Sequence, residues 1–559
     1  MRTELDARMD ATIAALTGEG GPLALGSVQR FGRALPCIAA APPTLPAYFA
    51  HFCAEHRDKE FLVSGVERLT FGQVHDAATR VAQALVHGWG VQPGDRVGIA
   101  ARNSSAWIVL YMGIVMAGGV ATLFNGWWQA EELAAGIAEV APRLVFADPP
   151  RLGRLAGVDV PVQVFDDAAP LDRALDAVFA RAHGGALPTV GADDHATILF
   201  TSGSTGRARG ALSTHRQVVQ GTFNFLASAL MMMTLAVQDG KPMAAQPATL
   251  LNVPLFHVTA MVPTFLQSFA QGRKLVLMSR WDAEEAMRLI EREHVTYFVG
   301  VPLMTLEMLN HPRRDAYDLS SVTDFAAGGA SRPVEHVRRL DAELPGSPLI
   351  GYGLTETNAV GAGNWRSNYL AKPSSTGRAS APLVDFAILD DAGHHVRHGG
   401  VGEIGIRSVA CFEGYWGRPD DTAACFTADG FFRTGDLGYL DNDGYLFIVD
   451  RKKDIIIRGG ENISCQEVES ALYAHRAVTE AAVFGLADER LGEVPCAVVH
   501  LAADEQVTPA ELVAFLGEHL AAFKVPHRLW LSPDPLPRLG TEKIDKGTLR
   551  KLYGDTVRG

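Results

Sequence analysis

A glycine-rich stretch at residues 197–210 carries the side chains with the most evident chemistry. It reads Thr-Ile-Leu-Phe-Thr-Ser-Gly-Ser-Thr-Gly-Arg-Ala-Arg-Gly. The apolar residues 198–200 predict a short strand, and the glycines after it let backbone N–H groups turn toward one point. Hydroxyls and two arginines then favour a polyphosphate ligand, although the spacing does not fit Gly-x-x-x-x-Gly-Lys-Ser/Thr. For this loop alone, an ordinary surface turn is the alternative.

Three further polar clusters follow along the chain. Gly351-Tyr-Gly-Leu-Thr-Glu-Thr357 offers a hydroxyl for phosphate and a carboxylate for Mg²⁺, which prefers one or two carboxylates plus phosphate oxygens. Asp436, followed by Asp450-Arg451, offers a carboxylate that accepts hydrogen bonds from ribose hydroxyls. Lys543 stands on a Pro/Gly-rich loop near the C-terminus. Taken singly, each cluster also fits a solvated turn or a surface lysine.

Length and composition restrict the possible functions. At 559 residues the chain is too long for one core, so two or more domains are expected. The net charge of −13 argues against nucleic acid or an anionic membrane as the main partner. The six cysteines lack metal-ligand spacing, so we expect no zinc site, no disulfides and a reducing, cytoplasmic compartment. The uncharged segment 106–124 predicts a core helix and a strand rather than a stable membrane span, because Gly118-Gly119 interrupts it.

The order of apolar segments predicts an α/β fold. Buried strands alternate with amphipathic helices up to about residue 383, which is typical of helix-covered, mainly parallel sheets. We expect an N-terminal extension at 1–45, a large domain at 46–452 and a small α+β C-terminal domain at 453–559. The last part of the large domain, 383–452, is expected to be rich in short β-strands.

In this order, the four clusters resemble those of the adenylate-forming enzymes: acyl- and aryl-CoA synthetases, firefly luciferase and peptide-synthetase adenylation domains. The resemblance covers about residues 45–550, and its longest stretch is 434–463. It implies a small C-terminal domain that moves between two half-reactions. In the first, a carboxylic acid and ATP give an acyl-adenylate and pyrophosphate. In the second, a thiol displaces AMP.

The resemblance also implies a role for each matching residue. The residues expected to hold ATP or AMP are Thr201, Ser202, Gly203, Ser204, Thr205, Gly206, Arg209, Gly329, Ala330, Ser331, Tyr352, Gly353, Thr355, Asp436, Arg451 and Lys543. The loop 201–210 would hold the β- and γ-phosphates, and Asp436 with Arg451 would hold the ribose. Lys543 would bridge the acid and the α-phosphate, which stabilises charge in the transition state.

The remaining implied roles concern catalysis, metal, coenzyme A and domain motion. The expected catalytic residues are Lys543, Thr355, Glu356 and His257. Glu356 would also be the Mg²⁺ ligand. The tunnel for the coenzyme A thiol would be lined by Gly459 and Gly460, and the hinge would be Lys453.

His257 narrows the choice of acid. It stands in the stretch 252–259, where peptide-synthetase domains place an Asp that pairs the amino group of their substrate. A buried ammonium would be left unpaired here, so an apolar fatty or aryl acid is expected. Residues that would either line an apolar pocket or belong to the core are Met261, Phe265, Val301, Met304 and Met308.

Three motifs depart from the usual residues: Ala208-Arg209 replaces Pro-Lys, Ser331 replaces a proline and Glu542 replaces a glycine. Arginine keeps the positive charge but presents a planar fork. The expected function is an AMP-forming acid–thiol ligase that uses ATP, Mg²⁺ and coenzyme A. The alternatives are an enzyme that loads a separate carrier protein, a luciferase-like oxygenase and a non-catalytic nucleotide-binding protein. A homodimer is left open.

Overall fold

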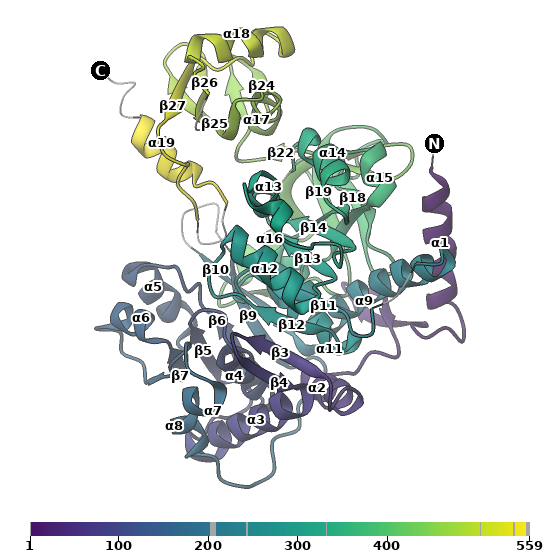
Figure 1. The fold of residues 1–559 in the computed structure, drawn as a ribbon, viewed down its shortest axis with the longest axis vertical. Helices are drawn as coiled ribbons and strands as arrows, with labels where there is room; N and C mark the ends of the chain where they lie inside the picture. The colour runs from purple at the N-terminus through teal and green to yellow at the C-terminus, as the bar shows by residue number, and fades with distance from the viewer. Residues whose placement is uncertain are drawn as a thin grey trace.

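The computed structural model describes residues 2–201, 208–241, 244–330, 332–502, 505–539 and 543–554. Figure 1 shows a large body with a smaller C-terminal part above it, from which the segment between β27 and α19 descends toward the body. The expected α/β fold with a large N-terminal and a small C-terminal domain is confirmed. Of the expected site residues and motif departures, the following lie outside the described residues: Ser202, Gly203, Ser204, Thr205, Gly206, Ser331 and Glu542.

A seven-stranded sheet forms one layer of the body, in the order β20-β10-β9-β6-β5-β7-β8. Its strands are β5 (Arg96–Ala100), β6 (Val120–Leu123), β7 (Leu144–Ala147), β8 (Val162–Val164), β9 (His195–Thr201), β10 (Arg209–Thr214) and β20 (Gly414–Tyr415). Packed with it are α3 (Phe71–Gln83), α4 (Ser105–Met116), α5 (Ala130–Val140) and α9 (His215–Gln238). The uncharged segment 106–124 thus forms a buried helix and a buried strand, as expected.

A nine-stranded sheet forms the second layer, in the order β17-β16-β15-β14-β13-β11-β12-β3-β4. Its strands are β3 (Glu60–Ser64), β4 (Glu67–Thr70), β11 (Ala248–Leu251), β12 (Lys274–Leu277), β13 (Tyr297–Gly300), β14 (Asp324–Gly328), β15 (Ser347–Gly353), β16 (Gly361–Trp365) and β17 (Arg378–Ala379). In the sheet order, the strands from β15 to β3 are parallel, and β12, β13 and β14 are followed by α12 (Ala283–Glu293), α13 (Pro302–Asn310) and α14 (Val334–Glu343). Helix α15 (Arg366–Ala371) follows the antiparallel strand β16.

Helix α9 lies in the core that the two large sheets share. By length and composition it is apolar enough to cross a membrane, but 72% of its most apolar window is buried inside the protein. Its hydrophobic residues therefore serve the core of the fold, where apolar side chains leave water by packing against both sheets.

Two smaller sheets follow in the sequence. The first, in the order β18-β19-β21-β22, contains β18 (Asp385–Leu389), β19 (Gly402–Arg407), β21 (Phe432–Leu440) and β22 (Leu446–Arg451). The second contains β23 (Ile456–Arg458), β24 (Glu461–Ile463), β25 (Val478–Asp488), β26 (Gly492–Leu501) and β27 (Arg528–Ser532), covered by α17 (Cys465–Tyr473), α18 (Pro509–His519) and α19 (Lys546–Gly554). The two sheets are joined by an exposed turn at 452–454.

The other elements are mostly short. They are α2 (Leu45–Glu55), η1 (Ala84–Gly88), α6 (Pro149–Leu152), η2 (Gly153–Leu155), α7 (Leu171–Ala174), α8 (Asp176–Phe179), α10 (Val258–Ala260), η3 (Met261–Leu266), α11 (Gln267–Gln271), η4 (Arg314–Ala316), η5 (Thr355–Thr357) and α16 (Pro419–Ala424). All six cysteines lie in the described part of the chain and are free.

The N-terminal extension is folded onto the body. It forms α1 (Glu4–Thr17) and a hairpin of β1 (Leu25–Arg30) and β2 (Arg33–Ile38). Helix α1 starts with a capping box at Thr3, and its buried Asp6 accepts a hydrogen bond from the Tyr445 hydroxyl at 2.9 Å. The apolar side of α1 packs against a cluster on α9, and Trp365 at the end of β16 packs against the same cluster.

Candidate active site

Lys543 reaches from a loop of the C-terminal part to the large body. The loop is held by a hydrogen bond from Leu539 N to Lys543 O at 2.8 Å. A Cβ placed on Gly329, after β14, would lie 3.3 Å from Lys543 Cε and 3.6 Å from Nζ. Gly329 also has a φ of +77°, which side chains disfavour. Glycine is therefore needed here both for the backbone conformation and for the space that the lysine occupies.

A buried carboxylate faces this lysine. Asp436 on β21 lies opposite Arg451 on β22, with Arg451 Nε 3.4 Å from Asp436 Oδ1. The Tyr352 hydroxyl donates to Asp436 Oδ2 at 2.7 Å. Burial raises the pKa of Asp436, whereas Arg451, the Tyr352 hydrogen bond and Lys543 act to lower it. The carboxylate is held in place and still has lone pairs for the hydroxyls of a ribose.

His257 contributes a neutral imidazole to the same region. It precedes α10, and its Nδ1 accepts a hydrogen bond from Thr259 N at 3.3 Å, so the ring proton is assigned to Nε2. Burial, followed by the charge of Lys543, lowers the pKa of His257 to about 3. A neutral Nε2–H can donate to a substrate oxygen without competing with Lys543 for the negative charge.

Tyr415 links the phosphate loop to Glu356. Arg209 begins β10 directly opposite Thr201 on β9, and its Nη2 donates to the Tyr415 hydroxyl at 3.2 Å. The Tyr415 hydroxyl donates in turn to Glu356 Oε1 at 2.7 Å. Within the described chain, Thr201 Oγ1 and Arg209 Nε are buried without a hydrogen-bond partner. Unpartnered buried polar atoms are costly, so these two are suited to contact a ligand.

Glu356 is the side chain that fits Mg²⁺. It is buried in η5, between Thr355 and Thr357. Burial raises the pKa of Glu356, while Tyr415 and Arg209 act to lower it. No group of three or more His, Cys, Asp or Glu in the described ranges is arranged to hold a metal ion. One carboxylate is still sufficient for Mg²⁺ when phosphate oxygens and water complete its shell.

Several expected residues lie apart from this cluster. Gly459 and Gly460 form an exposed turn between β23 and β24, and both have a positive φ. Lys453 lies in the exposed turn between β22 and β23. Neither the tunnel nor the hinge role is tested by these positions. Gly353 pairs with Gly361 in the β15–β16 ladder, and Ala330 is exposed directly after Gly329.

Sequence reasoning missed Tyr415 and a basic cluster beside the seven-stranded sheet. The strand order β6-β5-β7 places the first parallel strand between the next two, and ligands of open α/β sheets bind outside the carboxyl ends of such strands. Arg102 follows β5 there, and Arg151 in α6 follows β7. Arg151 forms an ion pair with buried Asp148 at 3.1 Å. The guanidinium groups of Arg102 and Arg151 lie 5.8 and 5.6 Å from the centre of the Trp127 ring. The spacing of these arginines in the sequence gave no signal.

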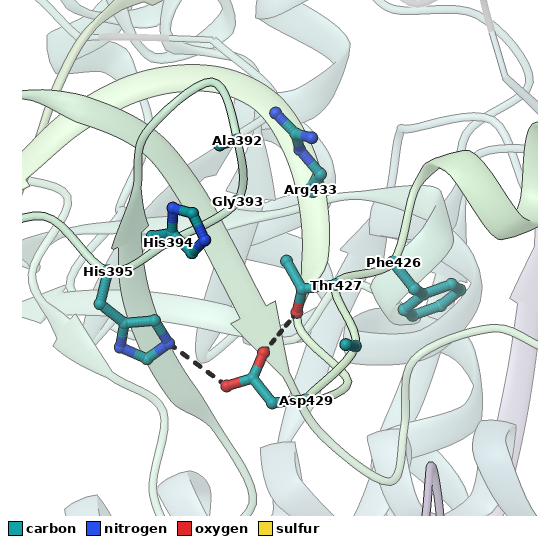
Figure 2. Close-up of a pocket in the computed structure, with 9 residues that line it drawn as sticks. Ala392, Gly393, His394, His395, Phe426, Thr427, Asp429 and Arg433 are labelled. Atoms are coloured by element: carbon teal, nitrogen blue, oxygen red, sulfur yellow. Dashed lines mark hydrogen bonds and ion pairs between the residues drawn. The ribbon is translucent and has the colours of Figure 1, made fainter.

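Two sets of residues do not belong to the cluster around Lys543. Met304 and Met308 pack with Phe298 and Phe325, in keeping with the core alternative for these methionines. A separate surface hollow of about 490 Å³ lies beside β21, and Figure 2 shows its wall, where His395 pairs with Asp429. None of the expected site residues lines this hollow.

Comparisons with known proteins cover almost the whole chain. The sequence profile of the "AMP-binding enzyme" family matches residues 49–416, and that of the "AMP-binding enzyme C-terminal domain" matches residues 467–543. A feruloyl-CoA synthase from Amycolatopsis sp is 34% identical over 491 residues, covering 88% of this chain and 95% of that protein. A long-chain-fatty-acid–CoA ligase from Bacillus subtilis is 30% identical over 538 residues, covering 90% and 93%. The ATP-bound crystal structure of MatB from Rhodopseudomonas palustris superposes with a TM-score of 0.80 at 28% identity, covering 92% and 99%.

Proposed function

This chain belongs to the AMP-binding enzyme family, and from that premise we propose that it is an AMP-forming ligase that joins an apolar carboxylic acid to coenzyme A. The observation that carries the proposal is the meeting of Lys543, His257 and the Asp436–Arg451 pair around Gly329. These residues come from four distant segments, and together they supply a cation, a neutral donor and a fixed carboxylate.

In the first half-reaction, an oxygen of the acid attacks the α-phosphorus of ATP, and the bond to pyrophosphate breaks. Both reactants are anions, so their approach needs positive charge between them. Lys543 supplies that charge, and His257 Nε2–H orients the acid. Thr355 contacts the α-phosphate, while Thr201 and Arg209 hold the departing pyrophosphate. Asp436 and Arg451 fix the ribose.

Mg²⁺ bound by Glu356 would neutralise charge on the phosphates when it is present. The part played by the chain itself is to hold that carboxylate. Tyr415 donates to one oxygen of Glu356, which leaves the other oxygen for the metal.

In the second half-reaction, the thiol of coenzyme A attacks the carbonyl carbon of the acyl-adenylate, AMP leaves, and the thiol proton passes to solvent. We propose that the C-terminal domain moves between the two steps by a rotation at the turn that contains Lys453. The thiol of coenzyme A would reach the site past Gly459 and Gly460. The six free cysteines support the reducing cytoplasm as the location of this protein, because thiols stay reduced there.

Exchange of labelled pyrophosphate into ATP in the presence of candidate acids tests this proposal. An acid–CoA ligase exchanges pyrophosphate without coenzyme A and forms a thioester when coenzyme A is added. A carrier-loading enzyme would exchange but ignore free coenzyme A, and a luciferase-like enzyme would consume oxygen. A protein that exchanges with no acid in a broad panel of fatty and aryl acids is not a ligase of this class.

Adenylation is expected to weaken at alkaline pH. Burial, with Arg451 as the second cause, lowers the pKa of Lys543 to about 8. The ammonium is complete below that pH and is lost as the pH rises through it. The kcat/KM for pyrophosphate exchange should therefore fall above about pH 8, because kcat/KM reports the free enzyme. Lys543→Arg should remove this fall, since a guanidinium stays charged. An unchanged alkaline limb in that variant would assign the titration to another group.

The basic cluster at the β5 and β7 ends is expected to contact the phosphates of coenzyme A. Arg102→Ala should raise the KM for coenzyme A about tenfold, which corresponds to loss of one charge-assisted contact. Pyrophosphate exchange, which does not use coenzyme A, should be unchanged. Arg173→Ala, an exposed arginine on α7, is the matched control. Equal loss of exchange and thioester formation in Arg102→Ala would contradict this placement.

A further inference from the structure

Three glycines form a row across one face of the nine-stranded sheet. Gly328 on β14 pairs with Gly351 on β15, and Gly351 pairs with Gly363 on β16. Directly paired residues project to the same face of a sheet. The row therefore presents backbone, and no side chains, over three adjacent strands.

There is room above the first two glycines. Among the described residues, a Cβ at Gly351 would have only Ala362 O within 4 Å, at 3.9 Å. A Cβ at Gly328 would meet Gly351 O at 3.7 Å and Thr259 Cγ2 at 3.8 Å. These are ordinary contact distances, so a methyl group fits at both positions. Thr259 lies two residues after His257, which puts the open part of the row beside the candidate active site.

Trp365 closes the other end of the row. At Gly363 a Cβ would lie 3.0 Å from three atoms of the Trp365 indole, Nε1, Cε2 and Cζ2. Trp365 itself pairs with Leu349 and packs against Val299 and Ala326 on the same face. The glycine row is thus bounded by an apolar row on one side and by the indole at its end.

The indole of Trp365 also packs against a cluster of Met231, Met232 and Leu235 on α9. The apolar residues of α1, which are Leu5, Met9, Ile13 and Leu16, pack against the same cluster. Helix α1 is fastened to the body through Asp6, which also accepts from Asn368 Nδ2 at 3.1 Å. The indole therefore has packed side chains behind it.

We propose, on the basis of the proposed ligase function, that Trp365, which packs against Met231 and Met232 of α9, ends the space over the glycine row and limits the length of the acid that lies there. The carboxylate of the acid would lie near Gly329, next to Gly328, because the side chain of Lys543 extends to this point. From Gly328 to Gly363 the row crosses two strand spacings, about 10 Å. That length suits a compact acid, such as an aryl propenoate or a short fatty acid. A long alkyl chain would meet the indole.

Trp365→Ala is the direct test, with pyrophosphate exchange measured for hexanoate, octanoate, dodecanoate, hexadecanoate and cinnamate. The wild type should prefer cinnamate and the short acids. The variant should raise kcat/KM for dodecanoate relative to hexanoate at least about tenfold, since a few methylenes in an apolar pocket carry that much discrimination. Trp281→Ala removes an indole that packs on the other face of the same sheet, and it should leave the profile unchanged.

Gly351→Ala tests the same inference without opening the core. Because the new methyl fits, the protein should keep its melting temperature, but the methyl would occupy the space assigned to the acid. The KM for cinnamate should rise about tenfold while the KM for ATP stays constant. Gly517→Ala, at an exposed position in α18 with nothing within 4 Å among the described residues, is the control.

The outcomes separate the inference from the function on which it rests. Absence of exchange with every acid overturns both. Exchange by the wild type with hexadecanoate as readily as with hexanoate overturns the inference alone. So does an active Trp365→Ala enzyme with an unchanged chain-length profile, or a Gly351→Ala enzyme with an unchanged KM for the acid.

Discussion

Replacing Lys543 by alanine is expected to lower the rate of acyl-adenylate formation by about 10²–10³-fold, the usual cost of removing one transition-state charge donor. The lysine projects beside Gly329 and shares its surroundings with Asp436 and His257. Its removal leaves the acid and the α-phosphate to approach without a cation between them. Because the group acts in the transition state, kcat should fall much more than the KM values for ATP and acid rise.

Steady-state pyrophosphate exchange measures this effect, and the second half-reaction supplies an internal control. When a synthetic acyl-adenylate is offered with coenzyme A, Lys543→Ala should form thioester at a rate near that of the wild type. Lys551→Ala, an exposed lysine on α19, should leave both half-reactions intact. Exchange within a factor of three of the wild type in Lys543→Ala would show that the lysine does not carry the chemistry.

Replacing Glu356 by glutamine is the second change with a large expected effect, about 10²-fold on adenylation. The amide oxygen can still accept from the Tyr415 hydroxyl, so the local contacts are retained. The charge that would hold Mg²⁺ is lost. A titration of exchange rate against Mg²⁺ concentration should therefore show a higher requirement for the metal as well as a lower maximum.

Tyr415→Phe removes the hydroxyl that donates to Glu356 and leaves the carboxylate itself in place. It should lower the exchange rate by about tenfold, less than Glu356→Gln, because the charge stays but one oxygen of Glu356 loses its donor. Glu518→Gln, an exposed carboxylate on α18, controls for loss of a negative charge. If Glu356→Gln and wild type respond identically to Mg²⁺, Glu356 is not the metal ligand.

The fold class and the types of side chain available for catalysis can be predicted from the sequence. Each motif is a short segment, and its residue types indicate its chemistry. Thr201 and Arg209 stand at the two ends of a glycine-rich loop, and Thr355 precedes Glu356 in a turn. Strands such as Leu144–Ala147 and Tyr297–Gly300 can also be predicted from the sequence, because a short apolar run between turns has few alternatives to a buried parallel strand. These are local properties, and local interactions decide them.

Which distant residues meet depends on how the whole chain folds. Tyr415 joins Arg209 to Glu356, Trp365 ends the glycine row, and α1 of the N-terminal extension packs against the same part of α9 as Trp365, yet no spacing in the sequence connects these positions. The lining of the apolar pocket is equally hard to predict from the sequence. Met304 and Met308 are residue types that could line a pocket, but they lie in the core with Phe298. Pairing register is the physical reason, because a shift of one residue between strands turns every side chain to the opposite face. Register is fixed by the packing of the whole sheet, and a single segment does not contain it.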